Sequence, residues 1–223
     1  MIEKKATAEK KRAPGRRRRP LTEIRQGNID HIVKAAEKQF ANHGFSGTTV
    51  SAIAEAAGLP KPNLLYYFKS KEGLYRAVLK RILRLWMEAM NDLRAEDHPR
   101  EALRGYIVRK LRQSRDFPDA SRIFAAEILH GAPYVREELE GPLKAQFDDT
   151  VAVFRAWIAK GWMEPVNPEH LMFTLWASTQ AYADYSLQMK VLLGRDELTD
   201  DDFDNAIELL TRLILKGCGI NIV

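Results

Sequence analysis

The sequence has little cysteine and no long hydrophobic run. Its single cysteine, Cys218, excludes an intramolecular disulfide and a site built from several thiolates, and it is typical of a reducing compartment. No segment approaches the roughly 18 uncharged apolar residues that a membrane helix needs, and the basic N-terminus is not followed by the apolar core of a secretory signal. We therefore expect a cytoplasmic protein without a membrane span, in which Cys218 is a plain core or tail residue.

Common catalytic motifs are also missing. The chain contains no glycine-rich phosphate loop, no GxSxG nucleophile elbow and no HExxH zinc motif. Glu127 and His130 have the ExxH spacing of two-metal helical bundles, but that chemistry needs a second ExxH pair, which the sequence lacks. Because His130 stands beside Gly131, a surface or capping histidine is the simpler interpretation. We expect no enzyme activity, no metal and no cofactor, with a helical metal enzyme as the remote alternative.

What is present is an ordinary globular composition with an uneven charge. Hydrophobic residues make up 45% of the chain and charged residues 29%, which argues against wholesale disorder. Residues 1–20 hold nine Lys and Arg against two Glu, a local charge of +7, whereas the whole chain carries +5. Such a basic cluster favours a polyanionic partner, because each neutralised phosphate releases counterions. We expect residues 1–24 to be a disordered basic arm that follows DNA; a merely solvated tail is the alternative.

Helical periodicity dominates from Ile24 to the C-terminus, and no stretch alternates with a period of two. The sequence therefore predicts an all-α fold. Thr49 is suited to cap the second of three N-terminal helices, and glycine at position 44 is suited to end the first. The expected helices are 28–43, 50–57 and 61 to about 67, with a sharp break at 58–60. Three helices with a tight turn between the last two are typical of a helix-turn-helix, whose final helix enters the major groove.

A second, larger group of helices follows. The expected ranges are 71 to about 95, 100–115, 119–130, 142–160, 168–190 and 200–216. Ser70, Asn167 and Thr199 are the expected N-caps, Pro142 and Pro168 are expected at first helical positions, and Asp202 completes a capping box with Thr199. We expect residues 25–70 to form the helix-turn-helix domain and 71–223 an effector-binding and dimerisation domain.

The segment from Thr48 to Tyr75, TTVSAIAEAAGLPKPNLLYYFKSKEGLY, resembles the signature of the TetR family of transcriptional repressors. The likeness covers the AxxAG turn, the pair Tyr67-Phe68 and the run Ser70-Lys71-Glu72. Pro60, Pro62 and Leu65 depart from the family pattern, and these positions concern the base preference rather than the motif. The resemblance implies three DNA-binding helices followed by a helical domain that dimerises and binds a small molecule.

Segments 63–72, 114–133 and 176–185 are similar to those of TetR-family members that regulate pyrimidine utilisation. The resemblance implies a homodimer on a palindromic double-stranded operator, with uracil or thymine as the effector that releases DNA. A TetR-like regulator of a different pathway with another small planar or apolar effector is the alternative. An architectural DNA-binding protein is a third interpretation, which a ligand-dependent change in DNA affinity would exclude.

The recognition helix is expected to present Lys61, Pro62 and Asn63 to base edges. An asparagine amide can make a bidentate contact with adenine, so Asn63 is the first candidate for base reading. Further residues are expected to hold phosphates through hydroxyl, ammonium or backbone N–H groups. These are Thr49, Tyr66, Tyr67, Lys69 and Lys71. Packing of the small domain would equally explain the two tyrosines.

An effector pocket needs apolar walls and a few directed hydrogen bonds. Trp176, Thr179 and Gln180 share one helical face with Ala183, and an amide can both donate to and accept from a pyrimidine edge. Trp86, Phe124 and Glu127 are expected to close the other sides. Ordinary core packing would also explain each aromatic ring. The helices 168–190 and 200–216 remain apolar at the end of the chain, and we expect them to form a four-helix bundle with a second copy.

Overall fold

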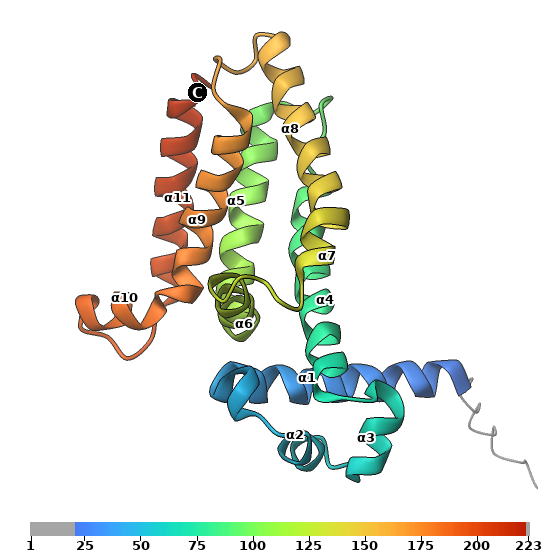
Figure 1. The fold of residues 1–223 in the computed structure, drawn as a ribbon. Helices are drawn as coiled ribbons and strands as arrows, with labels where there is room; N and C mark the ends of the chain where they lie inside the picture. The colour runs from blue at the N-terminus through green and yellow to red at the C-terminus, as the bar shows by residue number, and fades with distance from the viewer. Residues whose placement is uncertain (1–20, 222–223) are drawn as a thin grey trace, which may run out of the picture.

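The computed structural model describes residues 21–221, and every regular element in this range is a helix (Figure 1). The N-terminal part consists of α1 (Leu21–Gly47), α2 (Val50–Ala56), α3 (Lys61–Phe68) and the long α4 (Lys71–Met90). The remainder consists of α5 (Pro99–Asp116), α6 (Pro118–Leu129), α7 (Arg136–Glu138), the π-helical segment η1 (Leu139–Leu143), α8 (Lys144–Ala159), α9 (Pro168–Asp184), α10 (Ser186–Leu193) and α11 (Asp200–Gly217). The predicted all-α fold is confirmed. Between residues 21 and 221, none of these helices combines the length and the apolar character needed to cross a membrane.

The predicted N-caps are present. The side chains of Thr49, Ser70 and Asn167 accept hydrogen bonds from the backbone N–H groups of Ala52, Gly73 and His170, respectively. Thr199 and Asp202 form the reciprocal capping box at the start of α11. Each bond satisfies a backbone donor that has no partner inside its helix, which fixes where the helix begins.

Three boundaries in the N-terminal part differ from expectation. Helix α1 begins at Leu21 rather than near Asn28, so residues 21–24 of the expected arm are helical; residues 1–20 lie outside the described part of the chain. Gly44 leaves helical geometry at φ 67° as predicted, but a further helical turn follows it before α2. At the other end of the module, α4 stops at Met90 rather than near residue 95.

Two helices in the C-terminal part differ from the prediction, one at its start and one in its interior. Pro142 lies inside η1 rather than at the first position of a helix, and the wider π-turn accommodates a residue that has no N–H to donate. The expected helix 168–190 is broken at Tyr185, where φ is −110° and ψ is 20°. Helix α10 then projects away from the bundle, as Figure 1 shows, and leaves Leu187 72% exposed and Val191 69% exposed.

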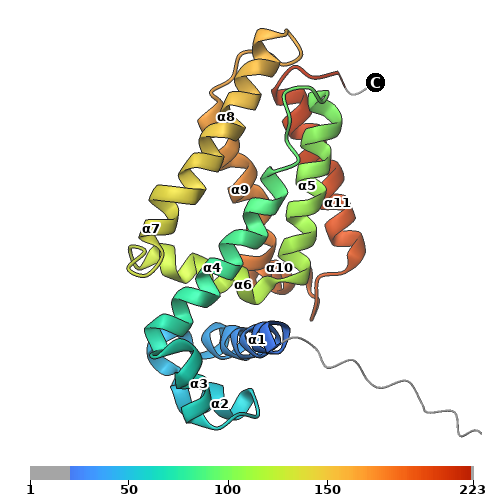
Figure 2. The ribbon, with the colours of Figure 1, turned by 90° about the vertical axis from the view of Figure 1, so that its right-hand side faces the viewer.

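The helices surround two hydrophobic cores. Helices α1, α2 and α3 gather at the foot of α4, and α5, α8, α9 and α11 run beside one another above them (Figures 1 and 2). The lower core joins the first four helices to α6 and includes Trp86. The upper core joins the end of α4 to α5, α8, α9 and α11 and includes Met90, one turn further along α4. The lower core extends along α4 to Trp86, beyond the predicted domain boundary at residue 70. The division of the chain into two domains at that residue stays a prediction.

Candidate DNA interface and effector cavity

The first turn of α3 presents an exposed polar edge. Lys61, Pro62 and Asn63 are all exposed, whereas Leu64 is fully buried and anchors the helix to the lower core. Pro60 precedes the helix without a side-chain cap. The Asn63 amide therefore has access to a ligand, and the buried leucine beside it fixes the direction of the helix.

The far end of α3 carries the two tyrosines and Lys69. Tyr66 is 76% exposed, and its ring stands edge-on to that of Tyr67 at 5.4 Å. Tyr67 is half-buried, and its hydroxyl accepts a hydrogen bond of 3.1 Å from Asn28 Nδ2 of α1. Lys69 is exposed and ends the helix in a left-handed conformation, with φ 60°. Tyr66 and Lys69 are thus the freer groups, whereas Tyr67 helps to hold α3 against α1.

Lys71 was expected to contact a phosphate, but its ammonium group makes hydrogen bonds within the protein. Its Nζ donates to the carbonyl oxygens of Phe45 and Thr48 at 2.9 and 3.1 Å and lies 4.4 Å from the centroid of the Phe45 ring. Lys71 therefore ties the start of α4 to the end of α1 and to the loop before α2. Thr49, next in that loop, is exposed, and its hydroxyl oxygen is already used as the cap of α2.

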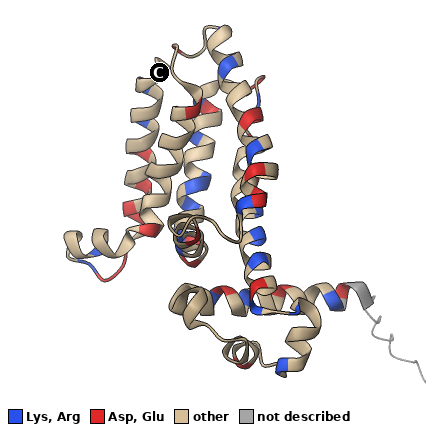
Figure 3. Cartoon of the chain, in the orientation of Figure 1, with Lys and Arg blue, Asp and Glu red and all other residues tan. Residues whose placement is uncertain are grey.

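Basic residues continue along α4 above the recognition helix, whereas acidic residues gather at the N-terminal end of α11 (Figure 3). The acidic group, Asp200 to Asp202, is favoured there by the positive end of the helix dipole.

Four of the six expected effector residues line one small cavity. Trp86 of α4, Phe124 of α6, and Trp176 and Gln180 of α9 meet around a space of about 60 Å³. Trp86 and Phe124 stand edge to face, with ring centroids 4.6 Å apart. The indole of Trp176 is fixed by a hydrogen bond of 2.9 Å from its Nε1 to the hydroxyl of Tyr106. The remaining lining residues are Leu83, Met90, Lys110 and Leu143.

Gln180 is half-buried at this cavity, and its side-chain amide has no hydrogen-bond partner among residues 21–221. The amide is therefore available to a ligand in the cavity, and it can donate and accept at once.

Thr179 and Glu127 do not line the cavity. Thr179 is fully buried, and its hydroxyl donates to the carbonyl of Leu175 at 2.7 Å, which is a local helix contact. Glu127 is 3% exposed, and its Oε1 accepts a hydrogen bond of 2.6 Å from the backbone N–H of Tyr134. Helical spacing placed both residues near the aromatic face but did not distinguish the side that faces the cavity.

Lys110 of α5 is the polar lining residue that sequence reasoning missed. It is 3% exposed, and its Nζ lies 5.0 Å from the centroid of the Trp86 ring. Burial lowers the pKa of Lys110 to about 8, although the charge of Asp184 acts in the opposite direction. A signal existed in the sequence, because Lys110 falls on the apolar stripe of α5 that Tyr106 and Ile107 mark one turn earlier.

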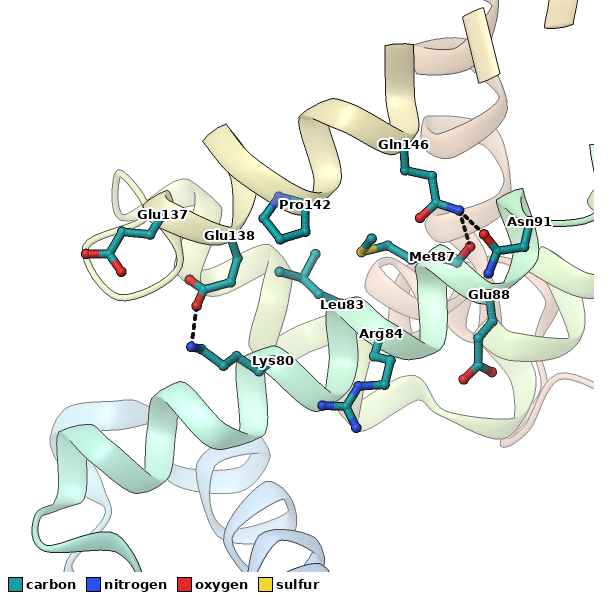
Figure 4. A pocket seen from close by; sticks show the side chains of 10 residues that line it. All are labelled: Lys80, Leu83, Arg84, Met87, Glu88, Asn91, Glu137, Glu138, Pro142 and Gln146. Carbon is teal, nitrogen blue, oxygen red and sulfur yellow. Dashed lines mark hydrogen bonds and ion pairs between the residues drawn. The ribbon is translucent and has the colours of Figure 1, made fainter. Parts of the chain in front are cut away.

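A larger groove lies outside the cavity, between α4 and the segment from α7 to α8 (Figure 4). It has a volume of about 490 Å³ and is bordered by polar groups, among them the ion pair of Lys80 and Glu138 at 2.8 Å. Leu83 lines both spaces, and Pro142 borders the groove while Leu143 borders the cavity. The groove has no aromatic wall among its lining residues, unlike the cavity.

No group of three His, Cys, Asp or Glu residues between positions 21 and 221 is arranged to hold a metal ion. His130 is exposed at the end of α6, where its Nδ1 lies 2.6 Å from the carbonyl oxygen of Ala126. Cys218 is buried in the upper core, as expected of a core residue.

Comparisons with known proteins agree with this arrangement. Residues 32–78 match the family described as "Bacterial regulatory proteins, tetR family", and residues 79–221 match "YcdC-like protein, C-terminal region" of TetR-type proteins. The chain is 44% identical over 186 residues to the HTH-type transcriptional regulator RutR of Escherichia coli K12, a match that covers 83% of this chain and 88% of that protein.

Solved structures show the same fold at lower sequence identity. The fatty acid degradation regulator FadR from Bacillus halodurans superposes with a TM-score of 0.66 at 18% identity, over 85% of this chain and 95% of that one. A regulator of the TetR/AcrR family from Thermobifida fusca superposes with a TM-score of 0.61 at 23% identity, over 86% of this chain and 98% of that one.

Proposed function

Because the chain belongs to the TetR family of bacterial regulatory proteins and is therefore a transcriptional regulator, we propose that it controls pyrimidine catabolism in response to uracil or thymine. The observation that carries the proposal is the cavity in which Trp86, Trp176 and Gln180 meet. Regulators of this family bind operator DNA and a small-molecule effector as dimers. RutR is 44% identical over most of its length, which supports a similar effector here.

The size and lining of the cavity support a small planar effector. Its volume of about 60 Å³ is well below the roughly 300 to 1,000 Å³ of pockets for drug-sized ligands, so a long acyl chain does not fit without large rearrangement. Aromatic rings from three helices supply flat apolar walls, and the Gln180 amide supplies a donor and an acceptor. A single-ring heterocycle with alternating N–H and C=O groups matches both features.

On the DNA side, Asn63 and Lys61 are proposed to meet base edges in the major groove, with Pro62 beside them. Tyr66 and Lys69 are proposed to hold phosphates, and Thr49 to add a further contact from the start of α2. Tyr67 supports α3 from within, and Lys71 supports the loop before α2. A homodimer presents two such helices, so the operator is proposed to be palindromic.

The cavity lies where the two cores meet, and this position supports release of DNA by the effector. Trp86 belongs to the lower core, which holds the recognition helix, and Met90 to the upper core, yet both line the cavity. A ligand that binds better to one tilt of α4 shifts the protein toward that tilt by its differential binding energy. The two recognition helices then leave the roughly 34 to 36 Å spacing of successive major grooves, and operator affinity falls.

The proposal is tested by titration calorimetry with uracil and thymine and by an operator shift assay with and without them. We expect both ligands to bind and to release the operator, and Gln180→Ala to lower effector affinity at least tenfold while effector-free DNA binding survives. Gln188→Ala is the matched control, since Gln188 is exposed on α10 outside the cavity. Absence of uracil and thymine binding by the wild type would overturn the pyrimidine assignment and leave the family membership intact.

A further inference from the structure

The buried ammonium group at the effector cavity has no partner of matching strength. Lys110 of α5 is 3% exposed and lines the same cavity as Gln180 of α9. Within residues 21–221, Lys110 Nζ makes no hydrogen bond or ion pair, and its contact is the face of the Trp86 ring at 5.0 Å. A charge removed from water normally has a hydrogen-bonded partner, because its desolvation is expensive.

The acidic residue that acts on Lys110 already accepts a hydrogen bond from another side chain. Asp184 of α9 acts on Lys110 through space, but its Oδ1 accepts a hydrogen bond of 2.6 Å from the hydroxyl of Ser121. Asp184 is itself half-buried, and burial raises the pKa of its carboxyl group. The carboxylate therefore lowers the cost of the nearby ammonium without supplying the hydrogen bonds that its three donors require.

We propose that Lys110 selects the effector by donating a hydrogen bond to a ring carbonyl, so that the cavity takes oxo-pyrimidines and their ionised relatives in preference to amino-pyrimidines. This inference rests on the proposed function and names the chemical group that the cavity reads. Lys110 can only donate, whereas Gln180 can adapt to either kind of group. The aromatic rings favour any flat ligand, whereas the ammonium group favours a ligand that presents a hydrogen-bond acceptor to it.

Three pyrimidines of nearly equal size separate these contributions. In uracil both exocyclic groups are carbonyl oxygens, so either end of the ring can face Lys110. In 2,4-diaminopyrimidine both are amino groups, so whichever end of the ring faces the ammonium sets donor against donor in a buried site. A site built around a buried polar group discriminates strongly against a ligand that leaves that group unpaired. Barbiturate adds a third exocyclic oxygen and a negative charge to the ring, and the charge strengthens the hydrogen bond from Lys110.

The experiment is titration calorimetry of uracil, 2,4-diaminopyrimidine and barbiturate against the full-length wild type, Lys110→Met and Lys110→Gln. We expect the wild type to bind uracil at least tenfold more tightly than 2,4-diaminopyrimidine, and barbiturate at least as tightly as uracil. In Lys110→Met, uracil and barbiturate should lose at least tenfold while the affinity for 2,4-diaminopyrimidine does not fall. Lys144→Met, a change at an exposed lysine of α8, is the matched control and should bind as wild type does.

Operator binding without effector shows that each variant is folded. Lys110→Gln provides a second polar side chain of similar length and should keep part of the affinity for uracil but lose the preference for barbiturate. If Lys110→Met binds uracil as tightly as the wild type does, the inference is overturned while the proposed function stands. If the wild type binds none of the oxo-pyrimidines, both are overturned.

Discussion

The backbone N–H of Tyr134 donates a hydrogen bond of 2.6 Å to Glu127 Oε1, and this bond holds the end of α6 near the foot of α4. The ring of Tyr134 lies 5.5 Å from that of Tyr75 on α4 and 4.7 Å from that of Phe45, which follows the bend at Gly44. Burial raises the pKa of Tyr75, and the charge of Glu127 and a hydrogen bond to it raise it further. Glu127 thus joins the helix that carries Phe124 to the DNA-binding module.

We expect Glu127→Ala to lower the free energy of unfolding by about 2 to 4 kcal/mol, because it leaves two buried donors without their acceptor at roughly 1 to 3 kcal/mol each. Glu127→Gln should cost less, since the amide oxygen can still accept. Urea denaturation of the wild type and the two variants measures the difference. The uracil affinity of Glu127→Gln should stay within about threefold of that of the wild type. A loss of affinity as large as that expected for Gln180→Ala would show that Glu127 contacts the effector.

The DNA-binding residues are expected to separate into base readers and phosphate contacts. Asn63→Ala should weaken operator binding by about 1 to 3 kcal/mol and relax the preference at one base pair in each half-site. Lys69→Ala should instead weaken binding to all sequences alike and reduce the salt slope by about one. Fluorescence anisotropy with operator and scrambled duplexes at several salt concentrations distinguishes the two patterns. Equal losses on both duplexes for Asn63→Ala would contradict its assignment as a base reader.

The sequence was a good guide wherever a single residue determines a local hydrogen bond. Thr49, Ser70, Asn167 and Thr199 each begin a helix as predicted, since a cap needs its own side chain and a backbone N–H two or three residues later. It was a poor guide at Tyr185, because apolar residues continue through α10 and only the tertiary arrangement shows that they leave the bundle.

The residues that line the cavity could be predicted only in part. Trp86, Trp176 and Gln180 were expected because aromatic rings and an amide on helical faces suit a flat ligand. Lys110 was not expected, since lysine on a helix normally reaches solvent, and its burial depends on how α5 packs against α9. Thr179 precedes Gln180 by one position and Glu127 follows Phe124 by three, so both lie near the lining residues, but their side chains bond to Leu175 and Tyr134 instead.

The dimer is expected to form through α9 and α11. Leu213 is 55% exposed and Leu209 44% exposed on α11, and Phe173 is 48% exposed on α9, although both helices pack against α5 on their other sides. Burying such residues against a second copy contributes roughly 25 cal/mol per Å² of apolar surface. Leu209→Glu combined with Leu213→Glu should therefore produce a monomer in sedimentation velocity at micromolar concentration. Leu129→Glu, at an 85% exposed leucine of α6, is the control and should remain dimeric.

Effector affinity is expected to depend on pH through Lys110. In the effector-free protein the pKa of Lys110 is about 8, and a carbonyl acceptor favours the charged form, so binding raises that pKa. Below about pH 8 the ammonium is already present and the affinity for uracil should be constant. Above it, binding must take up a proton, so the affinity should fall as the pH rises, approaching tenfold per pH unit.

Titration calorimetry between about pH 6.5 and pH 9, in buffers of different ionisation enthalpy, measures both the fall in affinity and the proton uptake. Asp184 faces Lys110 from α9, and burial raises the pKa of its carboxyl group, so Lys110→Met is the variant that assigns the transition to the lysine. In Lys110→Met the affinity should be low and show neither the fall centred near pH 8 nor the linked proton uptake. That variant should also melt at a higher temperature at pH 7, because it removes the cost of a buried charge that lacks a hydrogen bond. Uracil affinity that rises with pH, or that falls equally in wild type and Lys110→Met, would show that Lys110 does not donate to the effector.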